Sequence, residues 1–256
     1  MTRLFALLLI LAPLATPAAD LAREARITAQ IKNDIVGGEA VWIEVDDRAY
    51  LAVYRRSAAA RVRGAAILLH DRGAHPEWPE VIRPLATGLP EHGWDTLAIQ
   101  LPVAAADAPE RDWVDLIPEA APRIAAAVDW LHRRGRDNPV LIGHGLGARM
   151  AIAYLAANAA PTRIRALVAI SLAVPPERSA PVLEELRKLQ LPVLDVYGER
   201  DLPAVRDTTH ERLLAARDAQ NAVYTQVPIP AADPFFTGLD TALVGRIRAW
   251  LSRLEP

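Results

Sequence analysis

The chain has 256 residues, 52% hydrophobic and 23% charged, so it is long enough for one sizeable globular core and leaves little room for a second. Its formal net charge is −2, which excludes the basic excess that would attract nucleic acid or an anionic membrane surface. It has no cysteine, which excludes disulfides, thiolate nucleophiles and thiolate metal sites.

Residues 1–18 have the pattern of a secretory signal peptide. Arg3 supplies the basic start, an apolar run follows it, and small residues surround the expected cleavage point after Ala18 or Ala19. The apolar run is too short for a permanent membrane helix, and no cysteine follows it to carry a lipid anchor. We therefore expect a periplasmic or secreted protein with no stable membrane anchor after cleavage. Its net charge would then be −3, because Arg3 is the only charged residue removed.

A single domain is expected over residues 39–256, after a lead segment at 19–38. Two alternating segments, 39–45 and 48–55, are joined by a pair of aspartates and predict an antiparallel hairpin. Short apolar runs then alternate with helical stretches, which favours a mainly parallel sheet covered by helices on both faces.

The remaining elements follow in regular alternation. Strands are predicted at 65–70, 95–100, 140–143, 166–171, 192–197 and 222–229, and helices at 79–89, 118–134, 146–157, 180–189, 204–217 and 240–254. The stretch 104–111 is rich in alanine, aspartate and proline, so we expect a surface loop there. Only a loop and one helix fit between 171 and 192, so no large lid domain is expected.

The sequence VLIGHGLGAR, residues 140–149, predicts a strand, a sharp turn and a helix. With the element order, it resembles the α/β-hydrolase superfamily, in which this turn reads Gly-x-Ser-x-Gly and carries the nucleophilic serine. Gly143 and Gly147 match the flanking glycines, but Gly145 stands where the serine belongs. The resemblance begins near Val41 and runs to the C-terminus. It implies the α/β-hydrolase fold, with a twisted sheet of about eight strands.

The resemblance also implies an acid after the next strand but one and a histidine after the last strand. VYGERD ends in Asp201 at the acid position, although an aspartate there could instead cap a helix that starts near Pro203. IPAADPFFTG places Pro234 at the histidine position, and His210, the only histidine after Asp201, lies in a predicted helix. Since nucleophile and base are both missing, we do not expect the triad mechanism. Gly145 is expected to keep the positive φ of the turn.

A second signature, LLHDRGAHPEWP, follows the first parallel strand. In α/β-hydrolases this loop contributes to the oxyanion hole; His70 matches its first position, and Asp71 replaces its glycine. We expect His70, His75 and His144 to converge above the elbow. Such a cluster is typical of hydrogen bonds that hold loops, but acid/base chemistry stays open. It lacks the fixed spacing of metal ligands, so no metal and no cofactor are predicted.

The predicted ligand-binding residues surround the elbow: His70, Arg72, His75, His144, Gly145 and Leu146. The candidate rim aromatics are Trp78, Trp113, Phe235 and Phe236. No catalytic residue is assigned. Gly145, Asp201 and Pro234 are vestigial positions, and the candidates for residual chemistry are His70, His75, His144 and Asp71.

The segments HDRGAHPEWP, GWDTLAIQLP and LIGHGLGA are together similar to an uncharacterised family of exported bacterial proteins related to α/β-hydrolases. In that family, a domain of unknown function, the turn commonly carries glycine in place of serine. The resemblance implies the fold and no assigned reaction.

Two alternatives stay open. GHGLGA matches a dinucleotide-binding fingerprint through Gly143, Gly145 and Ala148, but it follows the third parallel strand and no acid ends the next strand. A hydrolase could use a non-standard nucleophile, Ser171, Asp71 or Asp201, or a histidine-assisted water. The preferred interpretation is an exported α/β-hydrolase-fold protein without the Ser-His pair. It would bind an unknown small molecule or envelope protein rather than act as an enzyme.

Overall fold

An eight-stranded sheet forms the centre of the part of the chain that the computed structural model describes, residues 19–158, 163–175, 179–221 and 223–254. The strands are β1 (Glu39–Val45), β2 (Arg48–Arg55), β3 (Gly64–Leu69), β4 (Trp94–Ile99), β5 (Val140–His144), β6 (Ala166–Ile170), β7 (Val193–Gly198) and β8 (Tyr224–Ile229). Their order in the sheet is β1-β2-β4-β3-β5-β6-β7-β8. The pairs β1–β2 and β2–β4 are antiparallel and all later pairs are parallel, which confirms the predicted sheet with its N-terminal hairpin.

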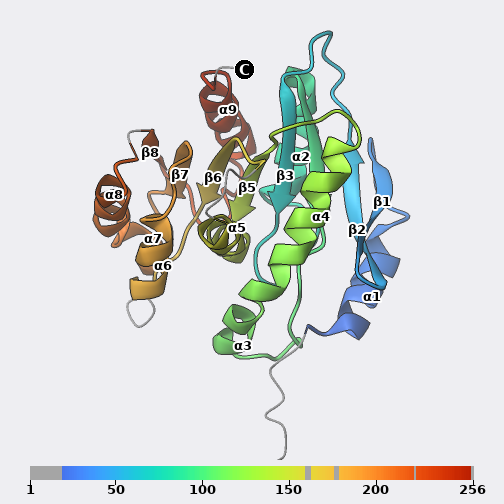
Figure 1. Cartoon of the computed structure of the whole chain (residues 1–256), viewed down its shortest axis with the longest axis horizontal. Coiled ribbons are helices and arrows are strands. Elements are labelled where there is room, and N and C mark those ends of the chain that lie inside the picture. Colours follow the sequence, from blue (N-terminus) through green and yellow to red (C-terminus); the bar gives the residue numbers. More distant parts are fainter. Residues whose placement is uncertain (1–18, 159–162, 176–178, 222, 255–256) are drawn as a thin grey trace, which may run out of the picture.

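Helices cover both faces of this sheet (Figure 1). They are α1 (Leu21–Ile31), α2 (Ile82–Gly88), α3 (Glu110–Asp115), α4 (Ala120–His132), α5 (Leu146–Ala157), α6 (Ser179–Leu186), α7 (Pro203–Arg206), α8 (Thr209–Asp218) and α9 (Asp240–Leu251), with short 3-10 turns at Pro90–His92 and Ile117–Glu119. None of these helices has the length and hydropathy needed to span a bilayer. Among the described residues, the segment between β6 and β7 forms only α6, so the predicted absence of a lid domain is confirmed.

The core has two layers because side chains alternate along the strands. Ile67 and Leu69 of β3 pack in one cluster with α4, α5 and α6, whereas Ala66 and Leu68 pack in a second cluster with α2 and α9. The parallel strands are therefore buried on both faces, which explains why their sequences read as nearly continuous apolar runs.

Helix α1 lies in the lead segment, for which no element was predicted. Its first turn is capped by the side chain of Asp20, which accepts a hydrogen bond from the backbone N–H of Arg23. Glu24 is buried and forms an ion pair with Arg123 of α4, with an N–O distance of 3.0 Å. Burial raises the pKa of Glu24, and the Arg123 guanidinium opposes that rise. This helix therefore docks onto the domain. The predicted signal peptide at 1–18 lies outside the described residues.

Two predicted elements differ from the structure for local reasons. The stretch 104–111 was expected to be loop only, but α3 begins at Glu110 after Pro109, with acidic residues in its first turn. The predicted helix at 204–217 is divided into α7 and α8. The guanidinium of the buried Arg212 donates to the carbonyl of Val205 and to the hydroxyl of Thr208. These bonds hold the chain at the point where the first helix ends.

Candidate functional site

The turn between β5 and α5 has the geometry predicted for a nucleophile elbow. Gly145 has a φ of +51°, which glycine adopts without strain, so the expected positive φ is confirmed. A Cβ on Gly143 would lie 2.5 Å from the backbone nitrogen of Ala148, and one on Gly147 would overlap the carbonyl of Leu69. The flanking glycines therefore allow strand and helix to pass closely, as the motif predicted.

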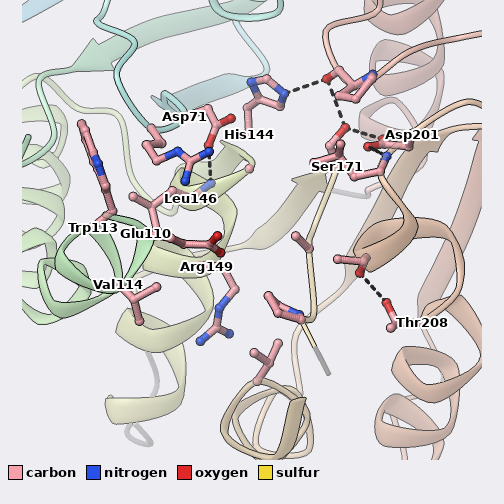
Figure 2. A pocket seen from close by; sticks show the side chains of 18 of the residues that line it. Asp71, Glu110, Trp113, Val114, His144, Leu146, Arg149, Ser171, Asp201 and Thr208 are labelled. Carbon is pink, nitrogen blue, oxygen red and sulfur yellow. Dashed lines mark hydrogen bonds between the residues drawn. The ribbon is translucent and has the colours of Figure 1, made fainter. Parts of the chain in front are cut away.

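Asp71, in the loop after β3, fills the space beside Gly145. A Cβ added to Gly145 would overlap the Asp71 carboxylate. Asp71 Oδ1 accepts a hydrogen bond of 2.7 Å from the backbone N–H of Leu146, the first residue of α5 (Figure 2). In a working hydrolase, this N–H follows the nucleophile and helps to bind the oxyanion. Here one carboxylate occupies the place of the serine side chain and engages that donor.

Asp201 is buried and fully engaged by neighbouring donors. Its Oδ2 accepts a 2.7 Å hydrogen bond from Ser171 Oγ (Figure 2). The same oxygen accepts a 3.2 Å bond from the backbone N–H of Gly198. Its Oδ1 accepts from the backbone N–H of Leu202 at 2.8 Å. The N-cap residue of α7 is Leu202. Asp201 therefore holds the loop before the helix and does not occupy the capping position that the sequence allowed as an alternative.

Pro234, which the sequence analysis assigned to the family's histidine position, contacts the site through its backbone. Its carbonyl oxygen accepts a hydrogen bond of 2.9 Å from His144 Nε2 and lies 3.3 Å from Ser171 Oγ. Ser171 Oγ lies closer to Asp201 Oδ2, at 2.7 Å, so its hydroxyl donates to that carboxylate. Because a carbonyl oxygen can only accept, His144 Nε2 carries a proton in this contact. Within the described residues, the buried Nδ1 of His144 has no hydrogen-bond partner.

Of the three imidazoles expected to converge, His144 lines the cavity above the elbow and His75 does not, and the ring of His70 is instead held by backbone groups of two loops. Its Nδ1 lies 2.8 Å from the carbonyl oxygen of Asp71, and its Nε2 accepts the backbone N–H of Leu101 after β4. Burial lowers the pKa of His70 to about 4, so this ring is a neutral bridge between two loops. His75 accepts the backbone N–H of Glu77, and burial lowers its pKa.

A cavity of about 970 Å³ opens above the elbow. Of the predicted ligand-binding residues, Arg72, His144, Gly145 and Leu146 line it, whereas His70 and His75 do not. The candidates Asp71, Asp201, Pro234 and Ser171 also line it.

The rim aromatics divide in the same way. Trp113 and Phe235 line the cavity. Phe236 is fully buried in the cluster beneath α9, and Trp78 packs at that cluster and against His75. The sequence placed all four at the rim because strand-end loops give no signal of which way each ring turns.

Helices α3, α5 and α6 add lining residues that the sequence analysis missed, including Glu110, Val114, Arg149 and Val182. Arg149 forms an ion pair with Glu185 at 3.0 Å, and burial lowers its pKa. Pro109, followed by acidic residues at 110 and 112, is a helix-start signal that could have revealed α3. The position of α3 over the cavity depends on packing and carries no local signal.

Two further expectations concern cofactors. Within the described ranges, no group of three or more His, Asp or Glu side chains is arranged to hold a metal ion. The glycine turn follows the third parallel strand along the chain, β5, and β6 ends at Ile170 with no acid, so the context of a dinucleotide site is not found.

Comparisons with known proteins agree with this geometry. The family model DUF3530, described as a protein of unknown function, matches residues 11–122 and 115–253. Curated proteins give no match. Among solved structures, XC6422 from Xanthomonas campestris, described as an α/β serine hydrolase without lid, is 16% identical, with a TM-score of 0.65 over 87% of this chain and 97% of that chain.

Two more solved structures have the same architecture. A dienelactone hydrolase from Anabaena variabilis is 22% identical, with a TM-score of 0.63 over 86% of this chain and 98% of that chain. Est1E from Butyrivibrio proteoclasticus is 16% identical, with a TM-score of 0.64 over 84% of this chain and 98% of that chain. At such identities the likeness concerns the fold. The chain belongs to the DUF3530 family and has the α/β-hydrolase fold.

Proposed function

We propose that this chain is an exported binding protein that holds a small molecule above the elbow without hydrolysing it. The observation that carries the proposal is the position of Asp71, whose carboxylate occupies the space of a serine side chain and accepts the Leu146 N–H. A triad needs an attacking oxygen and a base, and Gly145 and Pro234 provide neither. We therefore do not propose for this chain the serine hydrolase or dienelactone hydrolase activity that the descriptions of two structural neighbours name.

The cavity favours a small, largely apolar ligand. A volume of about 970 Å³ is of the size that holds a small organic molecule. Trp113, Val114 and Val182 contribute apolar walls. Leu202 and Phe235, which also line the cavity, are 54% and 46% exposed. Large apolar side chains at the mouth of a cavity are typical of a surface that a ligand or partner covers.

The export part of the proposal rests on residues 1–18 alone. Expression of the full chain in a Gram-negative host, followed by fractionation and N-terminal sequencing, tests it. We expect a periplasmic product that begins at Ala19 or Asp20. A cytoplasmic product that still begins at Met1 would overturn it.

A hydrolase that uses Ser171 is the second candidate, because Ser171 lines the cavity and its Oγ lies 2.7 Å from a buried carboxylate oxygen of Asp201. However, the ring nitrogen His144 Nε2 donates to Pro234 and offers no lone pair to that hydroxyl. A serine needs a base within hydrogen-bond reach to become a nucleophile. The geometry therefore favours binding.

Two measurements test binding against turnover. Short- and medium-chain p-nitrophenyl esters should not be hydrolysed above background, and a fluorophosphonate probe should not label the chain. The neutral dye Nile red should bind, and Val182→Trp should block its binding because the larger ring fills the cavity. Because Val182 is 2% exposed, circular dichroism first establishes that the Val182→Trp variant is folded. Leu214→Trp, at an exposed position on α8 that does not line the cavity, controls for the added ring.

Ester turnover or probe labelling that Ser171→Ala or Asp201→Ala abolishes would establish the hydrolase instead. Dye binding that Val182→Trp leaves unchanged would show that the cavity is not the binding site.

A further inference from the structure

The carboxylate of Asp71 changes what the floor of the cavity can bind. Its Oδ1 accepts the Leu146 N–H, while Oδ2 accepts no hydrogen bond within the described residues, and Asp71 lines the cavity. Figure 2 shows Asp71 beside the start of α5, between His144 and Leu146. A negative oxygen therefore faces the space where a hydrolase would place the carbonyl of its substrate.

The same contact occupies the backbone donor that an ester or carboxylate ligand would need at this place. The Leu146 N–H is the donor that would bind a carbonyl oxygen or an oxyanion, and it is already bonded to Asp71 at 2.7 Å. An anionic head group at this position would meet a fixed carboxylate and no free backbone donor from Leu146. The floor is therefore suited to hydrogen-bond donors and cations.

The other charges of the wall add to this preference. Glu110 and Asp207 line the cavity and form no ion pair among the described residues, and the same holds for Asp71. Asp201 is also acidic and is engaged by three donors. Two arginines, Arg72 and Arg149, line the cavity. Arg72 is exposed and forms no ion pair in the described part of the chain.

Arg149 is neutralised by its ion pair with Glu185. Among the described residues of the wall, apart from Asp201, three carboxylates and one guanidinium, that of Arg72, therefore have no ion-pair partner. A concave site with an excess of one sign of charge concentrates ligands of the opposite sign.

We infer that the cavity selects amines that carry an apolar chain or ring, with the ammonium group on Asp71 Oδ2 and the apolar part against Trp113, Val114 and Val182. This inference rests on the proposed binding function. An ammonium group offers three donors and one positive charge, which fits an accessible carboxylate oxygen at the end of an apolar cavity.

The test uses octylamine, octanol and octanoate, three probes with the same chain and different head charges. Calorimetry on the mature protein measures their binding below the micellar concentrations of the two ionic probes and below the solubility limit of octanol. At neutral pH the amine is protonated and the acid ionised. We expect octylamine to bind at least about tenfold more tightly than octanol, and octanoate to bind most weakly.

Asp71→Asn keeps an oxygen for the Leu146 N–H and removes the charge. It should lower the affinity for octylamine by about tenfold and change the affinity for octanol by less than about threefold. Asp115→Asn removes the same charge from an exposed position on α3 that does not line the cavity, and it should leave the preference for the amine intact. Arg72→Gln should strengthen octylamine binding, because it removes the unpaired cation of the wall.

The outcomes separate this inference from the proposed function. If octanol or octanoate binds as tightly as octylamine, and Val182→Trp blocks that binding, the cavity binds ligands but the preference for amines is wrong. If Asp71→Asn leaves octylamine binding unchanged, Asp71 does not hold the head group. If none of the three probes binds and Nile red binding is insensitive to Val182→Trp, both proposals fail.

Discussion

The Asp71 carboxylate and the backbone N–H of Leu146 join the loop after β3 to the first turn of α5 across 2.7 Å. The contact places a negative charge at the positive end of a helix, where it is stabilising. It also fills the space that any side chain at position 145 would need. The loop that holds the elbow thus also determines that the elbow residue is glycine.

Gly145→Ser should therefore destabilise the fold by about 2 kcal/mol, because the new Cβ overlaps the Asp71 carboxylate and the backbone φ is +51°. Gly73→Ser is the matched control: its φ is +73°, and no neighbouring heavy atom lies within 4 Å of the added Cβ. This control should lose only about 1 kcal/mol of unfolding free energy, which is the cost of a positive φ for a residue with a side chain.

Urea denaturation measures both losses. The double variant Gly145→Ser, Asp71→Gly should lose less free energy of unfolding than the sum of the losses of the two single variants. The difference should be at least about 1 kcal/mol, because removing the Asp71 side chain relieves the overlap. Strict additivity would contradict the overlap.

Building a triad with full reactivity should require three changes. Asp71→Gly, Gly145→Ser and Pro234→His together should react with a fluorophosphonate probe, because serine gains space, a base and the free Leu146 N–H. The variant that keeps Asp71 should react about a hundredfold more slowly, because Asp71 still occupies the Leu146 N–H and one oxyanion donor is lost. Probe-labelling rates measure this. Equal rates for the two variants would show that Asp71 does not close the site.

The buried His70 should make stability depend on pH. Burial lowers its folded pKa to about 4 from an ordinary value of 6.5, so the unfolded chain binds the proton more readily. The neutral His70 ring contributes about 3 kcal/mol to the free energy of unfolding. This contribution is fully present above pH 6.5 and is lost as the pH falls towards 4. Chemical denaturation across this range should show a shallower loss for His70→Gln. His210→Gln, at an exposed position on α8, should keep the wild-type slope.

The fully buried ion pair between Arg212 and Asp195, at 2.8 Å, should carry a large penalty when broken. Arg212→Met should cost about 3 kcal/mol or more, because it leaves a buried carboxylate without its cation. Tyr224 and Gln226 still donate to that carboxylate and limit the loss. Thermal and urea unfolding measure the change. Arg187→Gln, in a largely exposed pair with Asp218, should cost less than about 0.5 kcal/mol.

The positions of the strands and of most helices along the chain could be predicted because apolar periodicity and turn residues are local signals. The helix at 204–217 was mispredicted for a tertiary reason: the buried Arg212 bonds to Val205 and Thr208 at the break. Helix α1 was missed although Asp20 is a good capping residue, because its docking depends on the distant Arg123.

The sequence by itself determined that glycine stands at position 145 of the turn after β5 and proline at position 234 of the loop after β8, because these are statements about residue identity. Only the tertiary structure decided which groups lie at these two places: the carboxylate of Asp71 and the carbonyl of Pro234. It also decided that His70 turns away to bridge β3 and β4. The physical reason is that loops far apart in the chain meet at one edge of the sheet, and only their packing sets the direction of each side chain.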